Sequence, residues 1–215
     1  MNQTAERIEE ETVQELRALA ASFPSQGGAE IGPWLERYAA QVPPGAAIVE
    51  VGCWFGAGTA HLALGALENP AKPEIHVFDR FRANDEEVGK AAKFGLWLKA
   101  GQDTLPLVRS SLGRFAARIH FHKSDIRAIF WPPQPIALYV DDASKAEVLW
   151  NYAMSVFRPH FVPGAILVLM DYHFDEKAGE KYAAQKRYMA RHEGEFELIE
   201  ERMAGTTAAV FKHLK

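Results

Sequence analysis

The sequence has little cysteine, no long apolar run and no excess of basic residues. Cys53 is the one cysteine in 215 residues, so an intramolecular disulfide is excluded, and a single thiol cannot make a zinc site by itself. The longest apolar candidate, residues 164–170, is far shorter than the ~18 residues of a membrane span and has the length of a buried strand. Lys and Arg total 24 against 28 Asp and Glu, a net charge of −4, whereas a nucleic-acid surface needs a basic stripe that neutralises phosphates. We therefore predict no nucleic-acid partner and no membrane partner.

The composition that remains is that of an ordinary globular protein. Apolar residues make up 48% and charged residues 24%, and the length fits one domain of ~100–200 residues with short additions. Residues 1–19 are acidic and amphipathic, and they lack the basic and apolar regions of a signal peptide. We expect a cytoplasmic protein with a small-molecule partner. The amphipathic N-terminal segment is also a candidate contact for a homo-oligomer.

Two helical segments precede a Pro-Pro-Gly breaker at residues 43–45, after which strand and helix patterns alternate. We interpret residues 1–42 as a helical lid or cap segment and residues 43–215 as the main domain. The alternation predicts an α/β fold with a Rossmann-like, doubly wound and mostly parallel sheet, which a C-terminal antiparallel hairpin extends. Strands are expected at residues 47–51, 74–78, 118–121, 136–140 and 165–169, helices at 57–67, 85–99, 145–157 and 176–191, and the hairpin at 196–202 and 207–212.

A glycine-rich turn follows the first expected strand. It reads EVGCWFGAGT from Glu50, so its glycines are Gly52, Gly56 and Gly58, which is not the G-x-G-x-x-G spacing of dinucleotide-binding proteins. A strand that runs through such a turn into a helix lets a ligand approach the backbone closely. Glu50 fits poorly beside a pyrophosphate and well beside a cation, such as the ammonium or sulfonium group of S-adenosylmethionine (SAM). We predict that this turn binds the cofactor together with Thr59; the alternative is a tight turn without a ligand.

Acidic residues also stand at the ends of the next two expected strands. Asp79 follows the second strand, ~20 residues or more past the glycine turn, where a carboxylate accepts hydrogen bonds from ribose hydroxyls. Asp125 follows the third strand, where it is placed to accept from an adenine amino group while Ile126 supplies an apolar contact. A cap on a helix or turn explains Asp125 equally well. Because parallel strands share one carboxyl edge, we expect these residues to gather near Glu50.

Two further aspartates follow the fourth and fifth expected strands. Asp141 and Asp171 reach the same edge, and paired carboxylates there suit a hard divalent cation. Alternatively, Asp141 or His173 is a general base for a substrate hydroxyl. We predict Asp141 as the catalytic base or an ion ligand, Asp171 as the second ligand, and His173 as the alternative base.

Histidines mark the third expected strand. His120 and His122 lie on one face of it, as two metal ligands do, but no third ligand is near them in the sequence. Histidines on a covered sheet are more often packed and hydrogen-bonded. We therefore expect a structural role for this pair, and for His76 on the neighbouring strand.

Taken together, these motifs resemble the class I SAM-dependent methyltransferases, and among them the macrocin O-methyltransferase-like group that acts on sugars and small molecules. The resemblance covers about residues 46–172. It implies a methyltransferase fold, SAM as the cofactor, and transfer of a methyl group to a hydroxyl of a small molecule such as a sugar or secondary metabolite. The motifs that carry it are IVEVGCWFG from Ile48, VFDRF from Val77, IALYVD from Ile136, VPGAILV from Val162 and DY at Asp171.

The same resemblance implies a magnesium site built from the aspartates after the fourth and fifth strands. Asp141 and Asp171 occupy two of the ligand positions, but Met170 stands at the third, and a thioether is a poor ligand for a hard ion. This departure argues against a magnesium requirement. It also motivates an alternative from another class, a SAM- or nucleotide-binding protein that has lost metal-dependent methyl transfer. An NAD-dependent oxidoreductase is disfavoured by the glycine spacing.

Overall fold

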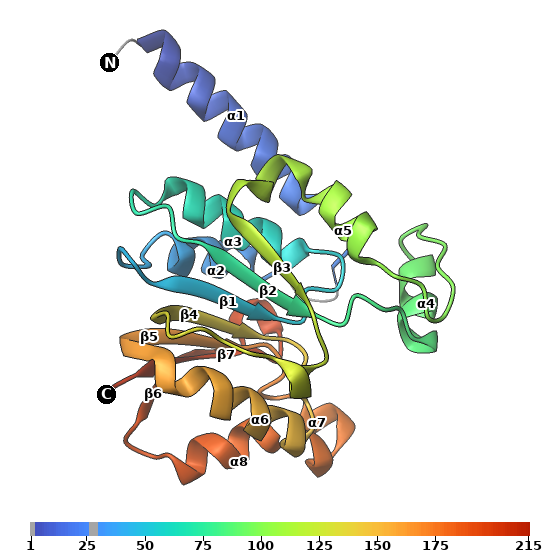
Figure 1. Cartoon of the computed structure of the whole chain (residues 1–215), viewed down its shortest axis with the longest axis vertical. Helices are drawn as coiled ribbons and strands as arrows, with labels where there is room; N and C mark the ends of the chain where they lie inside the picture. Colours follow the sequence, from blue (N-terminus) through green and yellow to red (C-terminus); the bar gives the residue numbers. More distant parts are fainter. Residues whose placement is uncertain (1–2, 26–29) are drawn as a thin grey trace.

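A seven-stranded sheet forms the centre of the molecule (Figure 1). The computed structural model describes residues 3–25 and 30–215 of the chain. The strand order is β3-β2-β1-β4-β5-β7-β6; β1 to β5 are parallel, and β7 runs antiparallel to both β5 and β6. The strands are β1 (Ala47–Val51), β2 (Ile75–Asp79), β3 (Ile119–Lys123), β4 (Ile136–Asp141), β5 (Phe161–Leu169), β6 (Phe196–Glu201) and β7 (Ala209–His213).

Helices cover both faces of this sheet, which explains why its central strands are buried throughout. Every residue of β1 and of β4 is buried, as expected for parallel strands with helices on each side. One face carries α1 (Gln3–Ala21), α2 (Gly32–Ala39), α3 (Ala57–Glu68) and α5 (Leu105–Ser111); the other carries α6 (Glu147–Phe157) and α8 (Ala184–Arg191) (Figure 1). The short helices α4 (Asp85–Ala92) and α7 (Asp175–Ala178) lie in the connections that follow β2 and β5.

Close packing of α2 on α3 fixes the N-terminal segment to the sheet. A Cβ on Gly65 of α3 would lie 2.1 Å from the backbone oxygen of Glu36, so only glycine permits this approach. The Asn69 side-chain amide ties the end of α3 to the end of α2 by donating to the carbonyl oxygens of Ala39 and Val42. The role of residues 1–42 as a lid or cap stays a prediction, and residues 1–2 and 26–29 of that segment lie outside the described residues.

The structure confirms the predicted α/β sheet with its C-terminal antiparallel pair, and it corrects two helices. The helix expected at residues 85–99 ends at Ala92, because Gly95 adopts a φ of +74° and the Leu96 amide donates to the Ala91 carbonyl, which closes the helix end. The helix expected at 176–191 is divided into α7 and α8, with Gly179 at a φ of +93° between them. The helix α5 has no counterpart among the expected elements.

Among the described residues, no helix combines the length and the apolar character that crossing a membrane requires.

Candidate functional site

The strand order reverses between β1 and β4, and the loops at the carboxyl ends of these strands meet there. In open α/β sheets this position is where ligands bind. The Gly52 amide donates to the Phe78 carbonyl at 2.8 Å, and the Asp142 amide donates to the Val51 carbonyl at 2.9 Å. Gly52 has a φ of +87°, and a Cβ on it would lie 2.7 Å from the Ala143 Cβ. Glycine is therefore required where the two loops cross.

The other two glycines of the turn are also constrained by close neighbours. Gly56 precedes α3 with a φ of +89°, and a Cβ there would lie 2.8 Å from the Leu112 side chain. A Cβ on Gly58, in the first turn of α3, would lie 2.6 Å from a carboxylate oxygen of Glu50. The three glycines are thus each required by a different neighbour: Gly52 by the loop after β4, Gly56 by Leu112, and Gly58 by the Glu50 carboxyl group.

Glu50 is the buried acid of this site. Its side chain is 3% exposed, and the Thr59 hydroxyl donates to it at 2.5 Å. Burial raises the pKa of Glu50 to about 8; the negative charge of Asp79 adds to this effect, and the Thr59 hydrogen bond opposes it. At neutral pH the carboxyl group is therefore mostly protonated, and a cation placed beside it would favour the carboxylate. A carboxyl group whose pKa is strongly shifted, at the point where the strand order reverses, marks a candidate functional site.

Asp79 holds the glycine-rich turn in place from the end of β2. One of its carboxylate oxygens accepts hydrogen bonds from the amides of Cys53 at 3.0 Å and Trp54 at 3.3 Å. The other oxygen accepts from the Phe81 amide at 2.7 Å. Asp79 is half-buried, so its carboxylate keeps a face that a ligand can reach.

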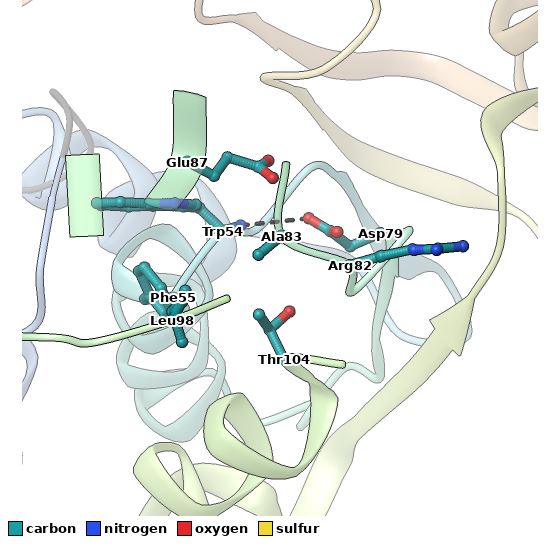
Figure 2. A pocket seen from close by; sticks show the side chains of 8 residues that line it. All are labelled: Trp54, Phe55, Asp79, Arg82, Ala83, Glu87, Leu98 and Thr104. Atoms are coloured by element: carbon teal, nitrogen blue, oxygen red, sulfur yellow. Dashed lines mark hydrogen bonds between the residues drawn. The ribbon is translucent and has the colours of Figure 1, made fainter. Parts of the chain in front are cut away.

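A small cavity of about 10 Å³ lies beside Asp79, large enough for roughly one water molecule. Figure 2 shows the side chains around it, with Trp54 and Glu87 on one side and Asp79 and Arg82 on another. Trp54 lines this cavity, and its ring contacts the rings of Phe55 and Phe94 at centroid distances of 4.5 and 5.7 Å. The lining residues are Trp54, Phe55, Asp79, Arg82, Ala83, Glu87, Leu98 and Thr104.

Asp141 lies at the end of β4 but points into the protein. It is fully buried, and its two oxygens accept hydrogen bonds from the Tyr139 hydroxyl at 2.6 Å and from the amides of Ala143 and Ser144 at 3.2 and 2.8 Å. Burial raises the pKa of Asp141, and these hydrogen bonds oppose the rise. In this geometry Asp141 shapes the loop after β4, and its roles as base or ion ligand stay predictions.

Three further charged groups follow β4 and β5: Asp142 is exposed, Lys145 is half-buried and Asp171 is buried. The Lys145 ammonium nitrogen lies 3.0 Å from a carboxylate oxygen of Asp171 and 4.9 Å from the centre of the Phe174 ring. Solvent reaches the Asp142 side chain, yet the surrounding protein and the charge of Asp171 raise its pKa, while Lys145 opposes the rise. Of these three residues, Asp171 is among the predicted site residues, and Asp142 is a possible substitute ligand for the residue that Met170 replaces. Lys145 is the residue that the sequence did not indicate, because no motif or strand end marks it.

His173 has both ring nitrogens engaged. Nδ1 lies 3.0 Å from a Glu176 oxygen and 3.2 Å from the Arg202 guanidinium, and Nε2 lies 3.0 Å from a Glu201 oxygen. The ring is buried among these charged groups at the C-terminal hairpin. To accept a proton from a substrate it must exchange one of these partners, so its role as a base also stays a prediction.

Asp125 and Ile126 follow β3 at the surface. The Asp125 side chain accepts from the Arg127 amide and pairs with the Arg127 guanidinium through two contacts of 2.9 and 3.1 Å. These hydrogen bonds lower the pKa of Asp125 to about 2. Ile126 is half-buried against the core on the α6 side of the sheet. The cap on the short turn is thus present, and the adenine contact stays a prediction.

Neither a protein-family model nor a curated protein sequence matches the chain. Solved structures do: the O-methyltransferase NovP superposes with a TM-score of 0.65 at 13% identity, over 87% of this chain and 81% of that one. The fold is that of the class I methyltransferases. The calicheamicin methyltransferase CalS11 gives a TM-score of 0.56 at 19% identity, over 95% of this chain and 92% of that one. The N-methyltransferase NodS from Bradyrhizobium japonicum WM9 gives a TM-score of 0.54 at 16% identity, over 86% of this chain and 96% of that one.

Proposed function

We propose that the protein binds SAM at the carboxyl ends of β1 and β2 and transfers its methyl group to a hydroxyl of a small molecule. One observation carries this proposal: the Gly52 turn, the buried Glu50 and Asp79 lie together where the strand order of a methyltransferase fold reverses. The similarity to solved methyltransferases, NovP and CalS11 among them, supports it.

The donor set of this site fits the chemistry of SAM. A buried acid that is neutral without a ligand gains a partner when the cationic methionine end lies beside it. The Asp79 carboxylate is the acceptor for ribose hydroxyls, and the positive φ at Gly52 and Gly56 lets the backbone of the turn approach the ligand. When bound, SAM supplies a methyl group that its sulfonium charge activates for transfer.

Binding requires the cavity beside Asp79 to enlarge. A cofactor site holds ~300–1,000 Å³, against about 10 Å³ here. The parts that must move are the Trp54 ring and the segment after β2 whose side chains line the cavity, residues 82–104. We infer that this segment closes over the cofactor, because few of its side chains are buried and its helix α4 is two turns long.

The acceptor side of the proposal rests on Asp142, Lys145 and Asp171. Asp142 is exposed and its pKa is raised, so it is the carboxylate best suited to take a proton from an acceptor hydroxyl. The carboxyl groups gathered at this edge favour a neutral or cationic acceptor over an anionic one. The donor set does not fit magnesium: both oxygens of Asp141 are already hydrogen-bonded inside the protein, and Met170 is a poor ligand. We assign no step to a metal here.

Isothermal titration calorimetry with SAM, S-adenosylhomocysteine and NAD tests the binding step. We expect binding of the first two ligands and none of NAD. Asp79→Asn should weaken SAM binding about 10- to 100-fold, the range for a lost hydrogen bond to a charged group, while the exposed control Glu197→Gln leaves it unchanged. Binding of NAD alone would overturn the proposal.

The transfer step is tested separately with SAM carrying a radiolabelled methyl group. A panel of sugars, phenols and other hydroxylated molecules is incubated with the protein, and label in the acceptor is measured with and without magnesium. Transfer that Asp142→Asn lowers at least tenfold, with SAM affinity unchanged, supports the assigned roles. SAM binding without transfer to any acceptor would favour a binding protein that has lost methyl transfer.

A further inference from the structure

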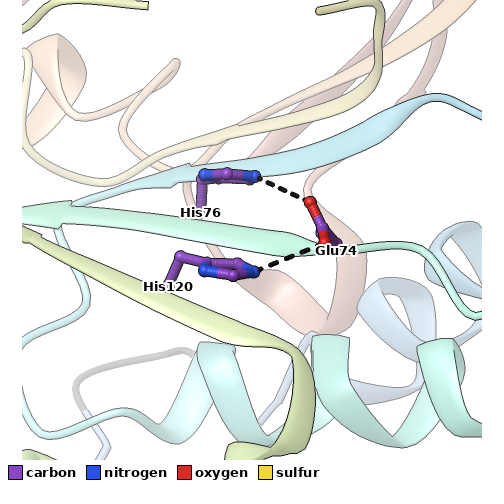
Figure 3. Close-up of side chains that lie close together, drawn as sticks. All are labelled: Glu74, His76 and His120. Carbon is purple, nitrogen blue, oxygen red and sulfur yellow. Dashed lines mark ion pairs between the residues drawn. The ribbon is translucent and has the colours of Figure 1, made fainter.

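Three side chains of metal-ligating type converge near the amino ends of β2 and β3, at the opposite end of these strands from Asp79 (Figure 3). Glu74 directly precedes β2, and His76 lies two residues further, so the alternation of a strand places both side chains on one face. β3 pairs with β2 in parallel, with His120 directly opposite His76. The register of two strands thus brings one carboxylate and two imidazoles together.

The geometry of the three groups leaves a space that a cation would fill. Each oxygen of the Glu74 carboxylate faces one imidazole: the His76 Nε2 and the His120 Nε2 each lie 3.7 Å from it. This distance is too long for a hydrogen bond. His76 is 9% exposed, and its Nε2 has no hydrogen-bond partner among the described residues. A buried, unpartnered nitrogen therefore points at a carboxylate that it does not bond.

The surroundings of His76 fix its ring in this orientation. Its Nδ1 lies 3.1 Å from the His122 Nε2, and the Trp131 ring packs edge-on against it at a centroid distance of 4.8 Å. When His76 Nδ1 donates to His122, the Nε2 carries the lone pair, which is the arrangement that a metal-binding histidine needs. Burial and the neighbouring imidazoles lower the pKa of His76 to about 4, so the ring is neutral at pH 7.

We propose that Glu74, His76 and His120 bind a divalent transition-metal ion, with zinc as the reference ion, and that the ion links the edge strand β3 to β2. Two imidazole nitrogens and one carboxylate are ligands that zinc accepts, whereas magnesium and calcium prefer oxygen alone. The three ligand atoms lie within 4.8 Å of one another. Ligands about 2.1 Å from a tetrahedrally coordinated ion lie about 3.4 Å apart, so closing the site takes a movement of about 1–1.5 Å.

Two of the three ligands lie at the surface, and the His120 ring, which stacks on the His76 ring at a centroid distance of 4.8 Å, must rotate to share an ion with it. Glu74 and His120 are exposed, with side-chain accessibilities of 48% and 47%, whereas His76 is held in the protein. Solvent exposure also gives the ion a path to the site. Three protein ligands leave a fourth position for water, an open coordination that distinguishes this site from a closed structural zinc site.

Zinc titration of the tag-free, metal-free full chain tests the proposal, with competition against a chromogenic chelator to measure the affinity. We expect one zinc ion per chain. His120→Ala and Glu74→Gln change exposed side chains and preserve the fold. His120→Ala should weaken zinc binding at least 100-fold, and Glu74→Gln at least tenfold. The matched controls His160→Ala and Glu197→Gln, which lie elsewhere on the surface, should bind as the unaltered protein does.

A positioning role for His122 has its own readout. His122→Phe keeps a ring stacked on Phe78 and removes the nitrogen that bonds His76, and it should weaken zinc binding about 10- to 100-fold. Cobalt in place of zinc should give visible absorption bands that His120→Ala abolishes. Absence of stoichiometric zinc binding at micromolar concentration, or equal affinity in His120→Ala, would overturn the proposal and leave the histidines as packing residues. The titration uses no SAM, so its result is independent of the proposed methyl transfer.

Discussion

Replacing Glu50 by glutamine should make the stability of the protein less dependent on pH. The buried carboxyl group has a pKa of about 8, against an ordinary value of 4.5. A folded-state pKa above the unfolded value means that this group stabilises the fold fully below pH 4.5 and loses that contribution as the pH rises toward 8. Glutamine cannot ionise, so the Glu50→Gln variant does not lose it.

The magnitude follows from the same two values. At about 1.36 kcal/mol per pH unit, the difference between the folded and unfolded pKa of Glu50 lowers the free energy of unfolding by about 1 kcal/mol at pH 5, about 3 kcal/mol at pH 7 and about 5 kcal/mol at pH 9. Below pH 8 this loss comes from ionisation of Glu50 in the unfolded chain. The amide NH₂ of glutamine adds a penalty that is the same at every pH, because it has no charge to gain. The diagnostic quantity is therefore the change between pH 5 and pH 9 in the difference in free energy of unfolding between the variant and the unaltered protein.

Urea denaturation at pH 5, 7 and 9 measures this gain for the unaltered chain, for Glu50→Gln and for the exposed control Glu197→Gln. The Glu50 variant should gain about 4 kcal/mol relative to the unaltered chain between pH 5 and pH 9, and the control should gain nothing. Parallel pH profiles for all three proteins would refute the assignment of a buried, protonated Glu50.

SAM binding should respond to the same ionisation, if SAM occupies the proposed site. A cationic ligand selects the carboxylate form, so the unaltered protein should bind SAM about tenfold more tightly for each pH unit from 6 to 8 and release a proton on binding. Calorimetry in buffers of different ionisation enthalpy counts that proton. Glu50→Gln should bind more weakly and release none; an affinity independent of pH would contradict the contact between SAM and Glu50.

Three further substitutions test the packing described above. Gly65→Ala places a methyl group 2.1 Å from the Glu36 carbonyl and should destabilise the fold by more than about 1 kcal/mol, whereas Gly89→Ala in α4, where nothing lies within 4 Å, should stabilise it by about 0.5–1 kcal/mol. Thermal denaturation distinguishes the two, and equal shifts would contradict the α2–α3 contact. Trp54→Ala removes a large side chain that lines the cavity beside Asp79 and should raise the association rate of SAM in stopped-flow measurements; an unchanged rate would show that this side chain does not limit entry.

Local patterns predicted most of the fold. Strand and helix periodicity identified the five parallel strands, the helix after the glycine turn and the C-terminal hairpin, because each depends on residues that are neighbours in the sequence. The predicted extents of two helices were wrong because Gly95 and Gly179 adopt a positive φ, which ends or interrupts a helix. Charged residues favour helix in both segments, but a single glycine with a positive φ is enough to stop a helix there.

The site was predictable in position but not in orientation. That Asp79, Asp141 and Asp171 stand at the ends of parallel strands follows from their place in the sequence, and the sheet brings these ends to one edge. Whether a carboxylate then faces solvent depends on the chain that packs above it. Asp141 turns inward to Tyr139 and the loop amides, while Asp142, one residue later, is exposed.

The sequence by itself determined the order of the strands along the chain, the position of the glycine-rich turn after β1, and the gathering of acidic residues at one sheet edge. Only the tertiary structure decided that Glu50 is buried under Thr59, that Lys145 pairs with Asp171, and that Glu74, His76 and His120 meet. These contacts depend on the register between strands and on which side chains exclude water. Both are properties of segments far apart in the chain, so periodicity within a segment carries no information about them.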